Sequence, residues 1–295
     1  MSYTDPTKRH EFVLLFDVTN GNPNGDPDAG NLPRVDPETM HGLVTDVALK
    51  RKVRDYLQLT QNVSIFIQSK VALNTLKEQV AGKVEPPISK EEKEGKKVIP
   101  RLQSQLCKEY FDIRMFGAVL ATGEKDARLN AGQVRGPAQF TFARSINPVL
   151  PLDLAITRQA RTTEERMETG TTEMGRKTLI PYGLYRSHGY FNPFLAKNTG
   201  VDTDDLMALW SALANLFDFD RSAARAEMAV RGLWVYTHDN EKGNAPAHRL
   251  FELIKTPAIE RSPRSFEDYA EVIRFPKDGP LDDQGFPGVA LKRLV

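Results

Sequence analysis

The stretch Phe12-Val-Leu-Leu-Phe-Asp-Val-Thr19 is followed at once by Asn20-Gly-Asn-Pro-Asn-Gly-Asp-Pro-Asp-Ala-Gly-Asn31. The first stretch is a run of β-branched, aromatic and other apolar residues, which predicts a buried strand. In the second, eleven of the twelve residues are Asn, Gly, Asp or Pro, the types that favour turns. The sequence therefore predicts a buried first strand that opens into a long loop over residues 20–31.

Patterns further along predict alternating helices and strands. A first helix is expected from Asp36, an N-cap followed by Pro37, to about Leu57. A second is expected after Asp202 or Thr203, where apolar residues recur at helical spacing. The other expected elements are a helix over 102–120 and strands over 63–68, 133–146, 179–191 and 228–238.

With the insertions removed, this order is close to β-α-β-β-α-β. It predicts an α+β fold with the ferredoxin-like topology of RNA-recognition (RRM-type) domains, a plain α/β fold being the alternative. We expect one domain over residues 1–295, interrupted by insertions at 70–131 and 151–178. Within the first insertion, residues 70–101 interrupt the pattern, and the charged, proline-containing stretch Glu85–Lys97 predicts a solvated or disordered excursion.

The second insertion, residues 151–178, contains seven threonines and no aromatic residue. This composition favours a long exposed β-hairpin, and a mobile surface loop is the alternative. Hairpins with nothing to pack on in their own domain usually contact a partner. A methionine at such a tip can wedge between stacked bases.

Composition excludes several classes of protein. The chain has 40 Lys and Arg against 39 Asp and Glu, so its net charge of +1 gives no global attraction to nucleic acid. Its single cysteine, Cys107, allows no intrachain disulfide and no cysteine-rich zinc site. Residues 1–10 are polar and the apolar run Phe12–Phe16 is short, so we expect no secretory signal, no membrane span and a cytoplasmic protein.

Catalytic motifs for nucleotide, metal or serine chemistry are missing from the sequence, and the five histidines show no metal-ligand spacing. We therefore expect no enzyme activity, no cofactor and no bound metal. Asp26 and Asp28 in the first loop could hold a divalent ion, but turn chemistry is the favoured explanation for both.

Local charge says more than the total. Lys50-Arg-Lys-Val-Arg54 places four cations in five residues of the first expected helix. Lys50 and Arg54 lie one turn apart and could reach adjacent phosphates. The alternative is an ordinary solvated face, in which Asp46 and Asp55 neutralise the cations.

Four motifs together resemble a known family. They are Phe16–Pro27, Val35–Thr39, Asp112–Gly117 and Val134–Gln139. The combination resembles the backbone subunit of type I CRISPR surveillance complexes (Cascade), and in particular the subtype I-C member of the Cas-seven family. The resemblance runs from about Glu11 to His238.

This resemblance implies an RRM-type palm with finger-like and thumb-like insertions, supplied by residues 70–131 and by the hairpin over 151–178. It implies that copies stack as a helical filament along a CRISPR RNA, and that each thumb flips out one base. The exposed guide then pairs with target DNA. Other Cascade subunits (large, guide-processing and small) are the further partners implied.

The resemblance also implies RNA contacts from the first loop, the first helix, the start of the Gly-Pro-x-Gln strand and the thumb. The residues at these places are Asn20, Asn22, Asn24, Lys50, Arg51, Arg54, Arg135, Gly136, Gln139, Arg158, Arg161, Arg166 and Met167. In related type III subunits a first-loop aspartate cleaves target RNA, so a cutting subunit that uses Asp26 or Asp28 is the alternative function. A metabolic α/β enzyme with solvated basic faces is a third hypothesis.

Overall fold

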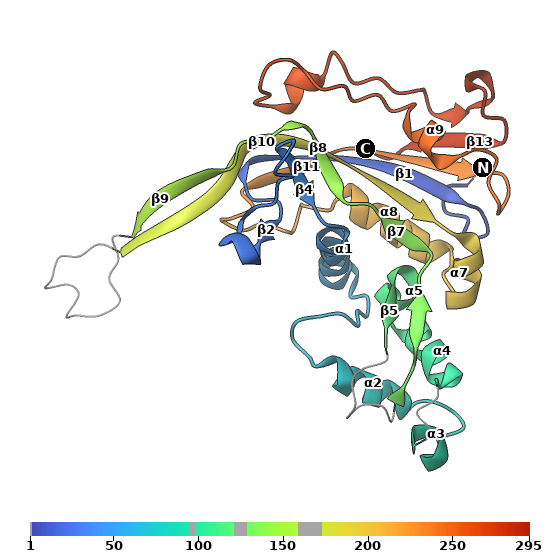
Figure 1. The fold of residues 1–295 in the computed structure, drawn as a ribbon. Helices are drawn as coiled ribbons and strands as arrows, with labels where there is room; N and C mark the ends of the chain where they lie inside the picture. Colours follow the sequence, from blue (N-terminus) through green and yellow to red (C-terminus); the bar gives the residue numbers. More distant parts are fainter. Residues whose placement is uncertain (1, 95–97, 121–128, 159–172) are drawn as a thin grey trace, which may run out of the picture.

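The computed structural model describes residues 2–94, 98–120, 129–158 and 173–295. Within them, one antiparallel sheet of nine strands forms the centre of the molecule (Figure 1), in the order β12-β13-β11-β1-β10-β8-β4, with β7 and β9 also paired to β10. Its strands are β1 (His10–Gly21), β4 (His41–Val44), β7 (Ala138–Phe140), β8 (Ala143–Pro148), β9 (Leu152–Arg158), β10 (Glu173–Phe191), β11 (Glu227–His238), β12 (Gly279–Pro280) and β13 (Val289–Arg293).

Helices and two small ribbons complete the described fold. The helices are α1 (Asp46–Gln61), α2 (Leu73–Ala81), α3 (Lys90–Glu94), α4 (Pro100–Glu109), α5 (Phe111–Phe116), α7 (Pro193–Thr199), α8 (Thr203–Ala214) and α9 (Ala247–Phe251). The ribbons pair β2 (Gly25–Asp26) with β3 (Leu32–Pro33), and β5 (Gly117–Val119) with β6 (Gln133–Arg135). The fold is thus α+β, as the sequence predicts.

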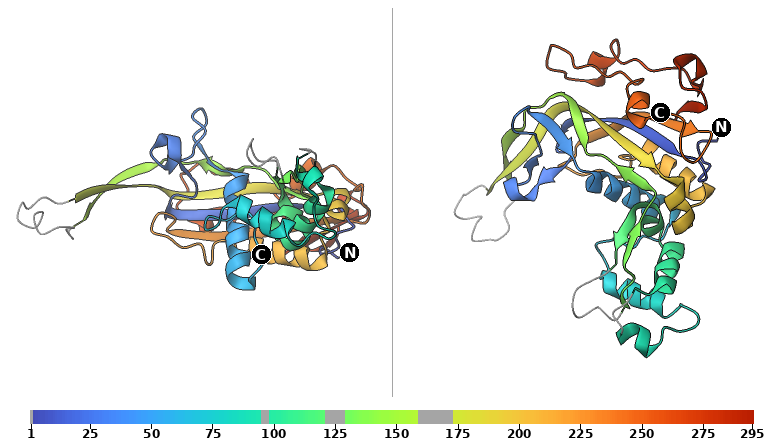
Figure 2. Two further views of the ribbon diagram at one scale, coloured as in Figure 1. Left: turned by 90° about the horizontal axis from the view of Figure 1, so that it is seen from below. Right: turned by 45° about the vertical axis from the view of Figure 1, so that its right-hand side comes forward.

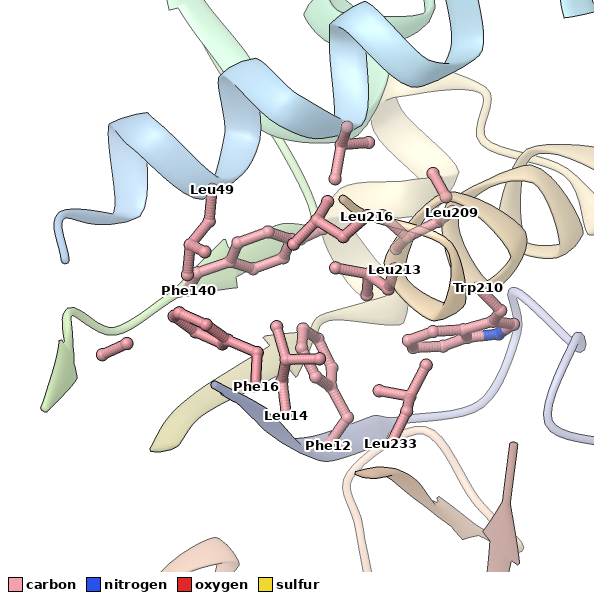
Figure 3. Packing of buried hydrophobic residues seen from close by; sticks show 14 of the residues in the cluster. Phe12, Leu14, Phe16, Leu49, Phe140, Leu209, Trp210, Leu213, Leu216 and Leu233 are labelled. Atoms are coloured by element: carbon pink, nitrogen blue, oxygen red, sulfur yellow. The ribbon is translucent and has the colours of Figure 1, made fainter. Parts of the chain in front are cut away.

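Strand β1 is covered on both faces. Phe12, Leu14 and Phe16 point into a core with α1 and α8 (Figure 3). Val13 and Leu15 point the other way, into a second core built with the C-terminal residues 245–291, which we call the C-terminal layer. Figure 2 shows helices on one side of the sheet and this layer on the other. Burial on both faces explains why the first stretch is apolar without alternation.

The first helix begins nine residues later than predicted. Asp36 caps a turn instead, accepting the Glu38 amide, and residues 41–44 form β4 beside β8. Thr45 is the observed N-cap, since its hydroxyl accepts the Ala48 amide. The second predicted helix is confirmed as α8, with a capping box between Asp202 and Asp205.

The insertion after α1 is also more ordered than predicted. Residues 63–68 do not form the expected strand. In the predicted excursion 85–97, residues 85–92 are mostly exposed, whereas Ile88 is buried and Lys90–Glu94 form α3. In the described part, α2, α4 and the segment after α2 enclose a separate apolar core that includes Leu76, Val80, Val84 and Leu102. Most charged residues of the lobe are exposed, with Lys77 of α2 a buried exception, so composition hid the few apolar positions that build the core.

One buried carboxylate joins this separate lobe to the sheet domain. Asp112 of α5 is fully buried, and one of its oxygens accepts the Arg54 Nε–H of α1 at 2.9 Å. The same carboxylate accepts the amides of Phe66 and Ile67. Those amides are therefore unavailable to a strand partner, which is why residues 63–68 remain irregular.

We expect Asp112→Ala to lower the free energy of unfolding by about 3–5 kcal/mol, because it leaves a buried guanidinium and two amides unpaired. Urea denaturation would measure the loss. Glu109→Ala is the matched control, since Glu109 pairs with the exposed Lys83 on the surface of the same lobe. Equal stability of Asp112→Ala and the control would contradict this account of the junction.

Candidate nucleic-acid interface

Two adjoining hollows of about 450 and 560 Å³ lie where the first loop, α1 and the β9–β10 hairpin meet. They share Asn22, Asn31 and Ala224, so together they form one open groove, which we call the loop groove. One end is lined by the base of the hairpin, through residues 176–178. The other is lined by the first three turns of α1 and by Ser222, Ala224 and Arg225.

Asparagines of the first loop hold the loop groove in shape. Asn22 donates its side-chain amide to the Asn31 carbonyl at 2.7 Å, and Thr178 of β10 donates to the same oxygen. Asn24 accepts the Thr45 amide at 3.0 Å, which ties the loop to the start of α1. The turn-forming residues of the sequence thus act here as side-chain hydrogen-bonding groups.

The lining of the loop groove is basic, although the chain as a whole is nearly neutral. Five cations line it against three carboxylates, those of Asp55 and Asp153 in the lining and that of Asp220, which pairs with two of the cations. The cations are Arg51, Lys52, Arg176, Lys177 and Arg225. Such an excess of positive charge in an open groove suits a polyanion and not a small uncharged substrate.

In the basic run of α1, some cations are exposed and others are buried in hydrogen bonds and ion pairs. Lys50 donates to Asp46 and to Gln139, at 3.1 and 2.9 Å, and its ammonium lies near the rings of Phe116 and Phe140. Arg54 is buried against Asp112. Arg51 is 65% exposed and only loosely paired. The expected shared phosphate-facing row of Lys50 and Arg54 is therefore not present in this structure, and Arg51 lines the groove instead.

Three other predicted contacts gather in a separate hollow beside α5, which we call the β6 hollow. It is lined by Arg135, Gly136 and Gln139, together with residues of β5. Arg135 is exposed, whereas Gly136 lies so close to Gly117 that a Cβ on either would collide with the other's backbone. The glycine is thus explained by packing. Lys50 links the β6 hollow to α1 through Gln139.

The predicted hairpin is confirmed in its described arms, where β9 pairs with β10 from Leu152↔Leu179 to Arg158↔Glu173. Figure 1 shows these arms projecting from the sheet. Leu154 and Ile156 lie on one face of β9 and are about half exposed. The proposed contacts Arg161, Arg166 and Met167 fall outside the described residues, and Arg158 is described only in its backbone.

Asp26 is engaged in local structure. Its carboxylate accepts the Asp28 amide at 3.2 Å and lies 3.3 Å from Arg34. It also caps the short 3-10 helix Pro27–Ala29. Across the described ranges, no three His, Cys, Asp or Glu side chains are grouped so that they could hold a metal ion. Asn20 is exposed beside this loop, in a left-handed conformation with φ of 51°.

Sequence reasoning missed one cluster at the groove. Asp220 pairs with Arg225, five residues further on, and with Lys52 of α1, which is distant in the chain. Burial lowers the pKa of Lys52, and its contact with Asp220 opposes that shift. No motif marks residues 218–226. The hydrogen bond from the Asn22 amide to the Ala224 carbonyl, and the close approach of Gly21 to the Arg225 carbonyl, place them against the first loop.

These features define a class: an α+β protein with a basic, loop-lined groove at the root of a projecting hairpin. Comparison with known proteins is more specific. The family model described as CRISPR-associated protein Cas7 matches residues 8–274, so the chain belongs to the Cas7 family, as its motifs predict. Within the described residues, no helix is long and apolar enough to cross a membrane.

The chain is also similar to individual proteins in sequence or in fold. The chain is 25% identical over 295 residues to a CRISPR-associated protein Cas7 of Haloferax volcanii, covering 93% of this chain and 80% of the relative. Its fold is similar to a chain of a CRISPR RNA-guided surveillance complex, pre-nicking, with a TM-score of 0.53, 13% identity, and coverage of 89% and 88%. For a chain of a second CRISPR RNA-guided surveillance complex the TM-score is 0.46, with 15% identity and coverage of 94% of this chain and 79% of that chain.

The different surroundings of neighbouring cations in α1 lead to a stability prediction. We expect Lys50→Ala to lower the free energy of unfolding by about 1–3 kcal/mol, because it breaks hydrogen bonds of a mostly buried charge. Arg51→Ala should change it by less than about 0.5 kcal/mol, as is usual for exposed sites. Parallel urea titrations would compare the two variants. A larger loss in Arg51→Ala than in Lys50→Ala would show that the two roles are reversed.

Proposed function

We propose that this chain is a CRISPR RNA-binding backbone subunit of a type I surveillance complex, of the I-C kind. Family membership supports the CRISPR role. The observation that carries the RNA-binding role is the excess of cations in the loop groove, on a chain with a net charge of only +1. Arg51, Lys177 and Arg225 are the groove cations that we assign to the guide backbone.

Strand order supports an RRM-type palm. Taking β1, β8, β10 and β11 as its four strands, the sheet order β11-β1-β10-β8 is the 4-1-3-2 arrangement of a ferredoxin-like unit. Helices α1 and α8 follow its first and third strands. The separate core of α2–α4 then corresponds to the fingers, and the β9–β10 hairpin to the thumb.

The way RNA binds must differ from that of a typical RRM, where bases stack on the open sheet face. Here that face is closed by the C-terminal layer, which buries Tyr182, Trp234 and Tyr236. The loop groove at the end of β1 remains available, and it meets the hairpin. An RNA strand in the groove would therefore run past the root of the thumb.

The projecting hairpin suits repeated assembly. A surface that protrudes from one copy and binds a different surface of the next generates an open helical filament. The half-exposed Leu154 and Ile156 give the thumb an apolar face for such a contact. Copies along one guide would hold its backbone and leave bases free to pair with target DNA. Large, guide-processing and small Cascade subunits would complete the complex in the cytoplasm.

We expect the purified chain to form RNA complexes whose mass rises in steps of one subunit as the RNA is lengthened. The logarithm of the association constant should fall linearly with the logarithm of the salt concentration, with a slope of about −0.7 for each phosphate contacted. Light scattering after size exclusion measures the mass, and fluorescence anisotropy measures the salt dependence. Arg51→Ala should lower the slope by about 0.7. A chain that stays monomeric and ignores RNA would refute the proposal.

We further propose that the subunit binds without cutting. Support comes from Asp26, whose carboxylate is engaged by the Asp28 amide and by Arg34. Incubating the assembled complex with complementary RNA and Mg²⁺ should therefore leave the RNA intact on a denaturing gel. Fragments at regular spacing that disappear in Asp26→Ala or Asp28→Ala would establish the cutting alternative, and Arg261→Ala provides the control for an unrelated charge change.

A further inference from the structure

The geometry points to Asp220 as a positioning residue that holds Arg225 as a fixed contact for an RNA phosphate in the loop groove. This inference rests on the proposed function and adds a phosphate subsite to it. The subsite lies between the first loop, α1 and the segment before β11. Its parts are Arg225, Asp220 and Lys52.

Asp220 is shared between two cations. One oxygen contacts the Lys52 ammonium, and the other contacts a terminal nitrogen of Arg225. Lys52 is only 5% exposed, so its charge serves mainly to hold Asp220. Arg225 is 36% exposed and lines the groove. A guanidinium has five N–H donors, so one contact to Asp220 leaves donors that can bind a phosphate.

The backbone around Arg225 is fixed as well. The Asn22 amide donates to the Ala224 carbonyl at 2.8 Å, and the Arg225 amide donates to the Ser222 hydroxyl. Gly21 lies so near the Arg225 carbonyl that any Cβ there would collide with it. Arg225 is thus held at both its main chain and its side chain. Arg51, in contrast, is held only by an exposed carboxylate 3.7 Å away.

An acid beside an RNA groove would ordinarily repel the ligand. Here the trio of Lys52, Asp220 and Arg225 has a net charge of +1, so the acid is neutralised and one positive charge remains facing the groove. Pre-organised groups lose less entropy on binding than mobile ones. The positioning role therefore predicts that removing the negative charge of Asp220 weakens RNA binding, whereas simple electrostatics predicts that it strengthens binding.

The test measures binding of a fluorescent single-stranded RNA by the full chain over a series of salt concentrations. Arg225→Ala should weaken binding roughly fivefold near physiological salt and lower the log–log slope by about 0.7. Asp220→Asn should also weaken binding, although it raises the net charge by one. In the Arg225→Ala background, Asp220→Asn should have no further effect on affinity, because it acts through the arginine.

Two controls separate positioning from folding and from general charge. Arg261→Ala removes an arginine that pairs with Asp268 in the C-terminal layer, and it should leave affinity and slope unchanged. Asp220→Asn alone leaves the buried Lys52 without its acidic partner. The double variant Lys52→Met/Asp220→Asn is therefore compared with the single variant Lys52→Met. Thermal melts confirm that each variant is folded. This pair should show the same weakening.

Unchanged or tighter binding by Asp220→Asn, and by the Lys52→Met pair, would overturn the inference. An unchanged salt slope in Arg225→Ala would overturn it too. Either result would leave RNA binding by the unaltered chain intact. Failure of the unaltered chain to bind RNA would instead refute the proposed function, and the phosphate subsite with it.

Discussion

Strand β1 has no face turned to water, and this constraint shapes the rest of the molecule. Phe12, Leu14 and Phe16 on one side, and Val13 and Leu15 on the other, are at most 1% exposed. Burying each such side chain contributes about 1.5–3 kcal/mol, so both covers are needed. Helices α1 and α8 supply one cover and the C-terminal layer supplies the other. Hence residues far from β1 in sequence are as much part of the fold as its neighbours.

Closing both faces moves the binding surface to the end of the strand. A two-sided core leaves no open sheet for a ligand, and β1 leads directly into the loop 20–31. The loop then contacts α1 through Asn24, β10 through Asn31, and residues 222–225 through Asn22. Binding residues are often carried by loops that a rigid scaffold positions. Here the scaffold is the sheet, and the groove forms where three of its connections converge.

Local signals predicted the elements that depend on local physics. The apolar run 12–19, the capped helix at Asp202 and the described arms of the threonine-rich hairpin all follow from composition or spacing, and the structure contains them. The predicted start of α1 is wrong because Asp36 can cap either a turn or a helix. Only the pairing of residues 41–44 with β8 decides between the two. The lobe core and the Lys52–Asp220 pair were missed because both depend on contacts between distant residues.

The net charge of the chain does not show where on the surface its charges lie. A net charge of +1 describes the whole surface, and it argued against a polyanion partner. The structure separates cations that neutralise buried acids, such as Arg54 with Asp112, from cations such as Arg51 and Arg225 that line an open groove. Charge patterning along the sequence cannot make this distinction, since Arg51 and Arg54 lie on the same helix. A nearly neutral chain can therefore present a basic groove, because many of its acidic residues are paired elsewhere in the fold.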